Sequence, residues 1–245
     1  MKLHRLGALV TVLAIGLLSQ GCGRLNSGAG LWDSEDDAKP VRLIVFGGNR
    51  SCKPDHNDRP TPLRMDMAAK IIGAINRLRS IGRQTDVLAS CFLDYDKVRV
   101  TRNLEGEDQD LTVDDLIREA GDSSSNSSKL FIVGHSYGGW MAMKLAVMLS
   151  GRLPLNGLIT VDPISRIKCT YSDWDGCFSA PQDINPEERM RIKDGTDAWS
   201  NFYQTNTPYL HSGKIEQADE NEKVDSDHFD IDTHERVWRR LDEWL

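Results

Sequence analysis

The stretch KLFIVGHSYGGWMAMKLAV, Lys129 to Val147, decides the fold. Its first part is a short apolar run typical of a buried strand, and its last part carries apolar residues at helical spacing. Between the two, Ser136 stands in the pattern G-x-S-x-G. Glycines without Cβ atoms permit a strained strand-to-helix turn that leaves a serine hydroxyl clear of the backbone. The stretch therefore predicts a tight turn, and Ser136 is either a nucleophile presented by that turn or a residue of a purely structural one.

Strands and helices alternate along the rest of the chain from Val41. Continuous apolar runs predict strands, and amphipathic runs predict helices. Thr112, followed three residues later by Asp115, predicts a capping box at one helix, and Asp232 is expected to cap the last helix. The alternation predicts an α/β fold with a mostly parallel sheet and helices on both faces. The expected strands are VRLIVFGG (41–48), TDVLASCF (85–92), LFIV (130–133) and GLITV (157–161), and the expected helices besides that after Ser136 are 64–80, 113–121 and 233–245.

The composition is that of one soluble globular domain. The chain has 245 residues, of which 39% are hydrophobic and 27% are charged. Its formal net charge of -7 gives it no basic surplus for neutralising phosphates, which argues against non-specific nucleic-acid binding. We therefore expect a small-molecule or lipid substrate and no nucleic-acid partner.

The first 22 residues have the pattern of an export signal. Lys2 and Arg5 precede the apolar run Leu6 to Leu18, which is short for a membrane span. The sequence LLSQGC resembles the lipobox of bacterial lipoproteins, although Ser19 stands where that pattern prefers leucine. The resemblance implies that Cys22 is lipidated and that the mature protein is anchored to a membrane of the cell envelope; a plain secretory signal is the alternative. Residues 23–40 are expected to form a flexible tether and 41–245 the folded domain.

Four further cysteines fit an exported protein. An even number of cysteines is suited to two disulfides in an oxidising compartment, although four cysteines allow three connectivities. Four isolated thiols are the alternative, and the absence of CxxC spacing in the sequence disfavours a zinc site. The candidates are Cys52, Cys91, Cys169 and Cys177.

The pattern G-H-S-Y-G at Gly134 to Gly138, with a strand before it and a helix after it, resembles the nucleophile elbow of the α/β-hydrolase family, particularly of its lipases and esterases. The resemblance implies that Ser136 is a nucleophile and that an acid and then a histidine follow it along the chain. Only two clear strands precede the elbow strand. The prediction therefore allows for a sheet without the first antiparallel strands of the family.

Three histidines follow Ser136, and His228 is the preferred catalytic base. It lies in the loop VDSDHFDID just before the terminal helix, where members of the family commonly place their histidine. His211, which precedes a possible strand, and His234, at the start of the terminal helix, are the alternatives.

Asp162 is the preferred triad acid. It ends the run GLITVDP, so its carboxylate is expected at the edge of the sheet where parallel strands end. Many members of the family carry the acid one strand later, whereas lipases resembling the pancreatic type carry it here. Asp219 and Asp197 are the alternatives in the later segment.

The oxyanion hole is expected to use the backbone N–H of Tyr137 and a second N–H from the loop FGGNR, either that of Gly48 or that of Asn49. No metal or organic cofactor is expected. The acidic run DSDHFDID does not have the spacing of an EF-hand loop and is interpreted as a solvated loop.

These features predict a serine hydrolase that cleaves a carboxylic ester through an acyl-enzyme intermediate. A thioester or amide substrate is not distinguished from an ester by the sequence. An acyltransferase with the same triad, or a non-catalytic surface protein that uses the fold for binding, are the alternatives. The segment between Pro163 and His228 is interpreted as an insertion that lines a pocket or forms a small lid.

Overall fold

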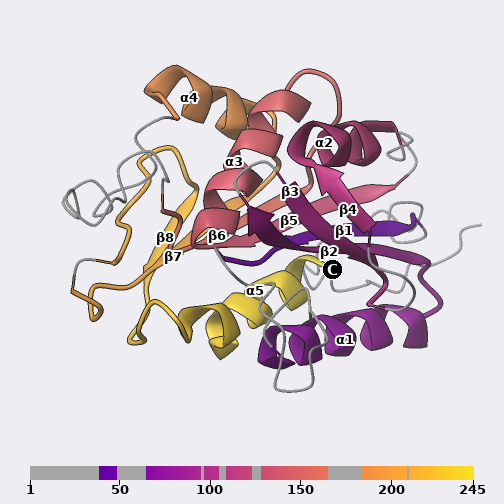
Figure 1. The fold of residues 1–245 in the computed structure, drawn as a ribbon, viewed down its shortest axis with the longest axis horizontal. Helices are drawn as coiled ribbons and strands as arrows, with labels where there is room; N and C mark the ends of the chain where they lie inside the picture. Colours follow the sequence, from indigo (N-terminus) through magenta and orange to yellow (C-terminus); the bar gives the residue numbers. More distant parts are fainter. Residues whose placement is uncertain are drawn as a thin grey trace, which may run out of the picture. The chain divides into compact units, whose positions relative to one another are not determined.

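The computed structural model describes residues 39–48, 65–94, 97–104, 109–122, 128–164, 184–208 and 210–245, all of which belong to one structural unit. The described residues form an eight-stranded sheet with helices on both faces (Figure 1). The predicted α/β fold class is confirmed.

The sheet has the strand order β4-β3-β2-β1-β5-β6-β7-β8. Strands β2, β1, β5, β6, β7 and β8 run parallel to one another, whereas β3 pairs antiparallel with β2 and with β4 at one edge. The strands are β1 (Val41–Phe46), β2 (Thr85–Asp94), β3 (Lys97–Arg102), β4 (Gln109–Thr112), β5 (Lys129–His135), β6 (Gly157–Val161), β7 (Trp199–Tyr203) and β8 (Glu220–Lys223).

Strand β1 lies at the centre of the sheet, and all six of its residues are buried. Its Ile44 pairs with Leu88 of β2 on one side and with Ile132 of β5 on the other. An apolar run with no polar alternation is what a strand covered on both faces requires. Because β1, β5, β6 and β7 are parallel, the residues that follow them meet at the same edge of the sheet.

Helices α1 and α5 cover one face of the sheet, and α2, α3 and α4 cover the other (Figure 1). Alternate residues of the central strands therefore enter two separate hydrophobic cores. The helices are α1 (Met65–Ser80), α2 (Val113–Asp122), α3 (Tyr137–Leu149), α4 (Pro186–Asp194) and α5 (Glu235–Trp244), and a short 3-10 turn, η3 (Ile231–Thr233), precedes α5.

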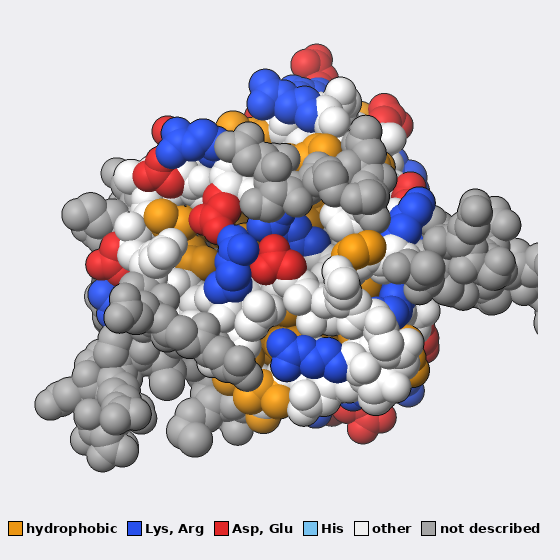
Figure 2. Space-filling view, turned by 90° about the vertical axis from the view of Figure 1, so that its right-hand side faces the viewer, with side chains coloured by type: hydrophobic (Ala, Val, Ile, Leu, Met, Phe, Trp, Pro, Cys, Tyr) orange, Lys and Arg blue, Asp and Glu red, His pale blue; other side chains and the backbone are white. Residues whose placement is uncertain are grey.

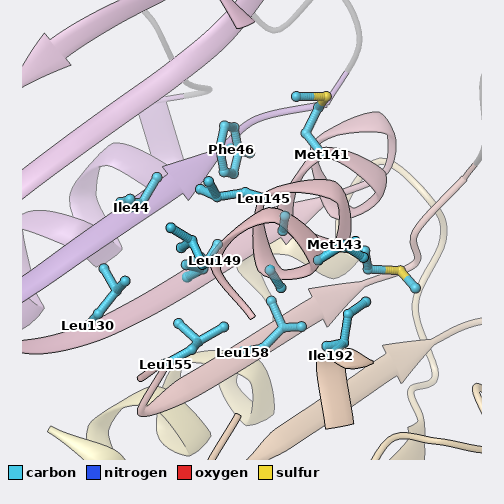
Figure 3. Packing of buried hydrophobic residues seen from close by; sticks show 14 of the residues in the cluster. Ile44, Phe46, Leu130, Met141, Met143, Leu145, Leu149, Leu155, Leu158 and Ile192 are labelled. Atoms are coloured by element: carbon cyan, nitrogen blue, oxygen red, sulfur yellow. The ribbon is translucent and has the colours of Figure 1, made fainter. Parts of the chain in front are cut away.

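Helix α3, which forms the second half of the stretch from Lys129 to Val147, packs directly on the sheet (Figure 3). Three of its residues, Met141, Leu145 and Leu149, face apolar side chains of β1 and β5, and all three are almost fully buried. Ten of its thirteen residues are buried. This burial fixes the position of the first turn of α3, which follows Ser136.

The predicted capping box at Thr112 is confirmed, because the Thr112 Oγ1 accepts the N–H of Asp115 at 3.1 Å and donates to its carboxylate at 2.7 Å. The expected cap at Asp232 is wrong. Helix α5 begins at Glu235, and the Nδ1 of His234 accepts the N–H of Arg236 at its start. Asp232 lies instead in η3, where it is buried.

Two expectations about strands need correction. Four strands precede β5 in the described chain, since β3 and β4 form an antiparallel edge after β2. The segment between Pro163 and His228 contributes α4, β7 and β8, so its described part belongs to the fold and is not an inserted lid. Strand β7 lacks a continuous apolar run because the buried Ser200 and Asn201 replace apolar contacts by hydrogen bonds to β8 and its neighbouring loop.

Several predicted features lie outside the described residues. These are the signal segment, Asn49 and the cysteines at 22, 52, 169 and 177, and for Cys91 only the backbone, in β2, is described. Lipidation and disulfide pairing therefore stay predictions. In the described part of the chain, no helix is long and apolar enough to cross a membrane.

Charged side chains of both signs are interspersed on the face shown in Figure 2. Among the described residues, Arg102 lies within 3.8 Å of Asp86 and also pairs with Glu119, and Arg42 lies 3.2 Å from Asp86. Burial lowers the pKa of the Arg42 guanidinium, and the nearby carboxylate of Asp86 opposes that shift. On this face, therefore, the two signs of charge are mixed.

The close approach of α3 to β1 leaves no room for a side chain at Gly138. A Cβ at Gly138 would lie 2.4 Å from the carbonyl oxygens of both Phe46 and Gly47, which are backbone atoms. We expect Gly138→Ala to lower the free energy of unfolding by about 1–3 kcal/mol, because overpacking must displace β1 or α3. Urea unfolding followed by circular dichroism measures the change.

Gly73→Ala is the matched control. Gly73 lies within α1, and the nearest atom to a Cβ there is the Nη1 of Arg77 at 3.6 Å. Alanine should leave the stability unchanged or raise it by up to about 1 kcal/mol, since it favours helix over glycine. Equal unfolding midpoints for the two variants would contradict the packing argument.

Candidate active site

Ser136 occupies a strained turn between β5 and α3. Its backbone angles are φ 57° and ψ -124°, outside the regions that residues with a Cβ prefer. Its N–H donates to the carbonyl of Val161 at the end of β6, and its own carbonyl accepts from Gly139 and Ile164. These backbone hydrogen bonds hold Ser136 in the strained conformation, which would not persist without such support.

The glycines of the motif are explained by contact distances. A Cβ at Gly134 would lie 2.2 Å from the carbonyl oxygen of Gly138, so the two ends of the turn pass too close for a side chain. The absence of a Cβ at Gly134 and Gly138 is what allows α3 to fold back over β5.

Ser136, His228 and Asp162 form a continuous hydrogen-bonded chain. His228 Nε2 lies 2.9 Å from the Ser136 Oγ, and His228 Nδ1 lies 2.7 Å from the Asp162 Oδ2. An ionised carboxylate only accepts, so the proton of the neutral imidazole is assigned to Nδ1, which leaves Nε2 to accept the serine O–H. The three side chains come from the turn after β5, the end of β6 and the loop after β8.

The arrangement combines a mostly parallel sheet, a serine in the tight turn after the fifth strand, and an acid and a histidine placed later in the chain. A serine exposed by a strand-to-helix elbow above such a sheet is the hallmark of one fold. The chain has the α/β-hydrolase fold.

Comparisons with known proteins add structural likeness only. No family model matches the sequence, and no curated protein matches it. The structure is similar to the ydeN gene product from B. subtilis, with 15% identity, coverage of 83% of this chain and 98% of that chain, and a TM-score of 0.48. It is also similar to Est1E from Butyrivibrio proteoclasticus, with 13% identity, coverage of 84% of this chain and 89% of that chain, and a TM-score of 0.48. The Pyrococcus furiosus esterase PF2001 has 12% identity, coverage of 86% of this chain and 82% of that chain, and a TM-score of 0.48. At these identities and scores the likenesses do not identify an activity for this chain.

Asp162 is a fully buried carboxylate in this hydrolase fold, with φ 44°. Aspartate visits that left-handed region more readily than most residues. Its Oδ1 accepts the N–H of Ser212 at 2.6 Å, and its Oδ2 accepts the Nε2 amide of Gln204 at 2.7 Å in addition to the imidazole. Burial raises the pKa of Asp162, but the hydrogen bond and charge of His228 and the bonds from Gln204 and Ser212 outweigh it, so the pKa lies below its ordinary value.

The two alternative acids, Asp219 and Asp197, bind groups outside the chain of Ser136, His228 and Asp162. Asp219 accepts the N–H of Trp199 at 2.9 Å and pairs with Lys193, and Asp197 accepts the side-chain amide of Asn156 at 2.9 Å. Trp199 begins β7, so Asp219 lies at the amino end of the strands, opposite Ser136. The structure therefore does not bring Asp219 into the hydrogen-bonded chain.

The alternative histidines also bind other groups. The Nδ1 of His211 lies 3.0 Å from the carbonyl of Ser212, and His234 caps α5 as described above. Among the described residues, neither ring forms a hydrogen bond with the Ser136 hydroxyl, which His228 binds.

The loop after β1 lies against the serine. A Cβ built at Gly48 would be 3.2 Å from the Ser136 Cβ and 3.6 Å from its Oγ, so a side chain at Gly48 would crowd the hydroxyl. Tyr137 begins α3, where backbone N–H groups favour negative charge. Gly48 and Tyr137 thus lie beside the serine, and Asn49 lies outside the described residues.

The sequence interpretation missed residues that support this chain. His135, next to the serine, donates from Nε2 to the carbonyl of His228 at 2.8 Å, and its Nδ1 lies 3.6 Å from Asp232. Gln204 and Ser212 bind the acid. His135 could have been found from its place in the motif, whereas Gln204 follows β7, a strand with no apolar run to reveal it.

The acidic run around His228 stabilises its own loop. Asp227 Oδ1 accepts the N–H groups of Phe229 and Asp230, and Asp225 accepts the side-chain amide of Asn206. Within the described residues, no group of three or more His, Cys, Asp or Glu side chains is placed to hold a metal ion. The Asp227 carboxylate thus forms an Asx-type turn that shapes the loop, and Asp225 connects the loop to Asn206.

Acid should weaken the folded state through Asp162. The folded protein binds the Asp162 proton less tightly than the unfolded chain, whose pKa is near the ordinary 3.8, so protonation favours unfolding. The stabilising contribution is present above that value and is lost as the pH falls through the lower folded pKa. We expect the difference in unfolding free energy between wild type and Asp162→Asn to stay the same near neutral pH and to narrow as the pH falls below about 4. Urea titrations at each pH measure it, and a constant difference would contradict the assigned shift.

Proposed function

We propose that this protein is a serine hydrolase that cleaves a carboxylic ester through Ser136, His228 and Asp162. The observation that carries the proposal is the buried chain of 2.9 Å and 2.7 Å contacts from hydroxyl to imidazole to carboxylate. A serine hydroxyl alone holds its proton at neutral pH, and a base within hydrogen-bond distance removes that limitation.

In the proposed reaction, His228 Nε2 takes the proton of Ser136 as the Oγ bonds to the ester carbonyl carbon. The carbonyl π electrons move to the oxygen, and Asp162 stabilises the imidazolium by remaining ionised. The oxyanion then re-forms the carbonyl and expels the alkoxide, which receives the proton from Nε2. A water molecule repeats the sequence on the acyl-enzyme, and the acid and Ser136 are released.

The oxyanion is proposed to be bound by the backbone N–H of Tyr137 and by one from the loop that contains Gly48. Support comes from the position of Gly48, where an added Cβ would lie 3.2 Å from the Ser136 Cβ, and from the position of Tyr137 at the start of α3. Fixed donors of this kind stabilise the charge that develops in the transition state.

An apolar group of the substrate is proposed to lie against Phe229. The ring of Phe229 meets the ring of His228 edge-on, with centroids 5.5 Å apart, and 59% of the residue is exposed. An exposed aromatic side chain next to a catalytic base offers an apolar surface where the leaving group or acyl chain would lie. This supports esters with an apolar portion.

Turnover of p-nitrophenyl esters of graded acyl length tests the proposal. We expect release of p-nitrophenol by the wild type, and a loss of at least about a thousandfold in kcat/KM for Ser136→Ala, because the nucleophile is removed. Ser80→Ala is the matched control, since its hydroxyl bonds to Arg77 at the exposed end of α1. Circular dichroism establishes that each variant is folded.

Absence of turnover in the folded wild type across the panel would contradict the proposal and favour the binding-only alternative. Adding primary alcohols separates hydrolysis from acyl transfer. Ester products that exceed the free acid would replace the hydrolase proposal by the acyltransferase alternative.

A further inference from the structure

Gln204 is a fully buried amide next to the proposed acid. It directly follows β7, and its Nε2 donates to the Asp162 Oδ2 at 2.7 Å and to the carbonyl of Leu210 at 2.8 Å. Asp162 Oδ2 is also the oxygen that His228 Nδ1 contacts. The amide of Gln204 and the imidazole of His228 thus share one carboxylate oxygen.

The other end of the same amide is equally occupied. Its Oε1 accepts the backbone N–H groups of Asn206 at 2.7 Å and Thr207 at 2.8 Å. A side-chain amide has two donors and two acceptor sites, so the hydrogen-bonding capacity of Gln204 is filled. Its orientation is unambiguous, because Nε2 faces only acceptors and Oε1 faces only donors.

Thr207 extends this network to the histidine. Its Oγ1 accepts the backbone N–H of His228 at 2.7 Å. The turn from Gln204 to Thr207 therefore contacts both members of the acid–histidine pair, the acid through the amide and the histidine through the hydroxyl.

We propose that Gln204 is a positioning residue that fixes the carboxylate of Asp162 and, through Thr207, the backbone of His228. The inference rests on the proposed function for its kinetic consequence, but the geometry that it describes does not depend on turnover. This role needs the amide of glutamine. An ionised glutamate has no N–H to donate to Asp162, and an apolar side chain of the same length can neither donate to Asp162 nor accept from the backbone of Thr207.

The ionisable groups around the pair limit what a pH profile can report. Asp162 lies at 2.7 Å from the imidazole, the ring of His135 has its centroid 5.1 Å from that of His228, and Asp232 lies 3.6 Å from His135. Asp227 and Asp230 flank His228 on its own loop and are exposed. Of these ionisable groups, Gln204 forms a hydrogen bond only with Asp162. Replacing Gln204 therefore changes the surroundings of the Asp162 carboxylate directly and those of the other groups only through it.

The test compares Gln204→Met with Asn201→Leu. Asn201 is an equally buried amide in β7, but it donates to the carbonyl of Gly213 and to Asn221 and not to the acid. Two readouts follow the pair: the proton resonance of His228 Nδ1–H, which responds to the length of the bond to Asp162, and the pH dependence of kcat/KM for a p-nitrophenyl ester. Urea unfolding measures the stability of both variants.

We expect both variants to lose stability. Only Gln204→Met should shift the Nδ1–H resonance. Because Asp162 loses a donor, this variant should also move the acidic limb of the pH profile of kcat/KM to higher pH by about one unit. Its kcat should fall by about tenfold to a hundredfold, with KM within about twofold of the wild-type value. Equal behaviour of the two variants in both readouts would overturn the inference and leave Gln204 a merely structural residue.

Gln204→Glu keeps the inference testable if Gln204→Met does not fold. A protonated glutamic acid can donate to Asp162 in place of the amide, so the wild-type Nδ1–H resonance should be present at low pH and lost as the new carboxyl ionises. A resonance independent of pH in this variant would overturn the inference. If the wild type turns over no ester, the proposed function fails, and the resonance alone decides the role of Gln204.

Discussion

The buried charge of Asp162 is the constraint on which the rest of the site depends. An ionised carboxylate without water is costly unless hydrogen bonds replace its hydration. Here Ser212 and Gln204 supply two donors, and His228 supplies a third. Those donors come from the chain after β6, so the loops at 204–212 and around His228 are arranged about one carboxylate, and the same arrangement turns Nε2 of the imidazole toward Ser136.

The serine depends on a second constraint, which is the close packing of α3 on β1 and β5. The turn at Ser136 is strained, and its geometry is maintained by hydrogen bonds to Val161 and Ile164 and by glycines that leave no room for a Cβ. The rigid sheet therefore determines where the hydroxyl lies, and the acid network determines where the base lies. Ser136 follows β5 and Asp162 ends β6, and these neighbouring parallel strands end at the same edge of the sheet. The imidazole that Asp162 binds therefore lies 2.9 Å from the hydroxyl.

The sequence predicted the fold class and suggested the residues that this structure brings together, because each follows a recognisable pattern. Ser136 lies in a glycine motif, Asp162 ends an apolar run, and His228 lies in the last polar loop. The supporting residues could not be found in that way. Strand β7 carries Ser200 and Asn201 in the interior of the sheet, where hydrogen bonds replace apolar contacts. The sequence therefore has no apolar pattern from which the strand, or Gln204 directly after it, could be predicted. Strands β3 and β4 were missed for a related reason: β4 is a short strand at the edge of the sheet with no buried residue, and β3 alternates its buried Val98 and Val100 with charged residues.

Covalent labelling of the intact protein by a fluorophosphonate tests most directly whether Ser136 is activated by this network. Peptide mass spectrometry of the wild type should place one adduct on the peptide that contains Ser136. The adduct should be absent in Ser136→Ala and should form far more slowly in His228→Ala. A folded wild type that forms no adduct, or an adduct that forms equally fast without His228, would contradict the account.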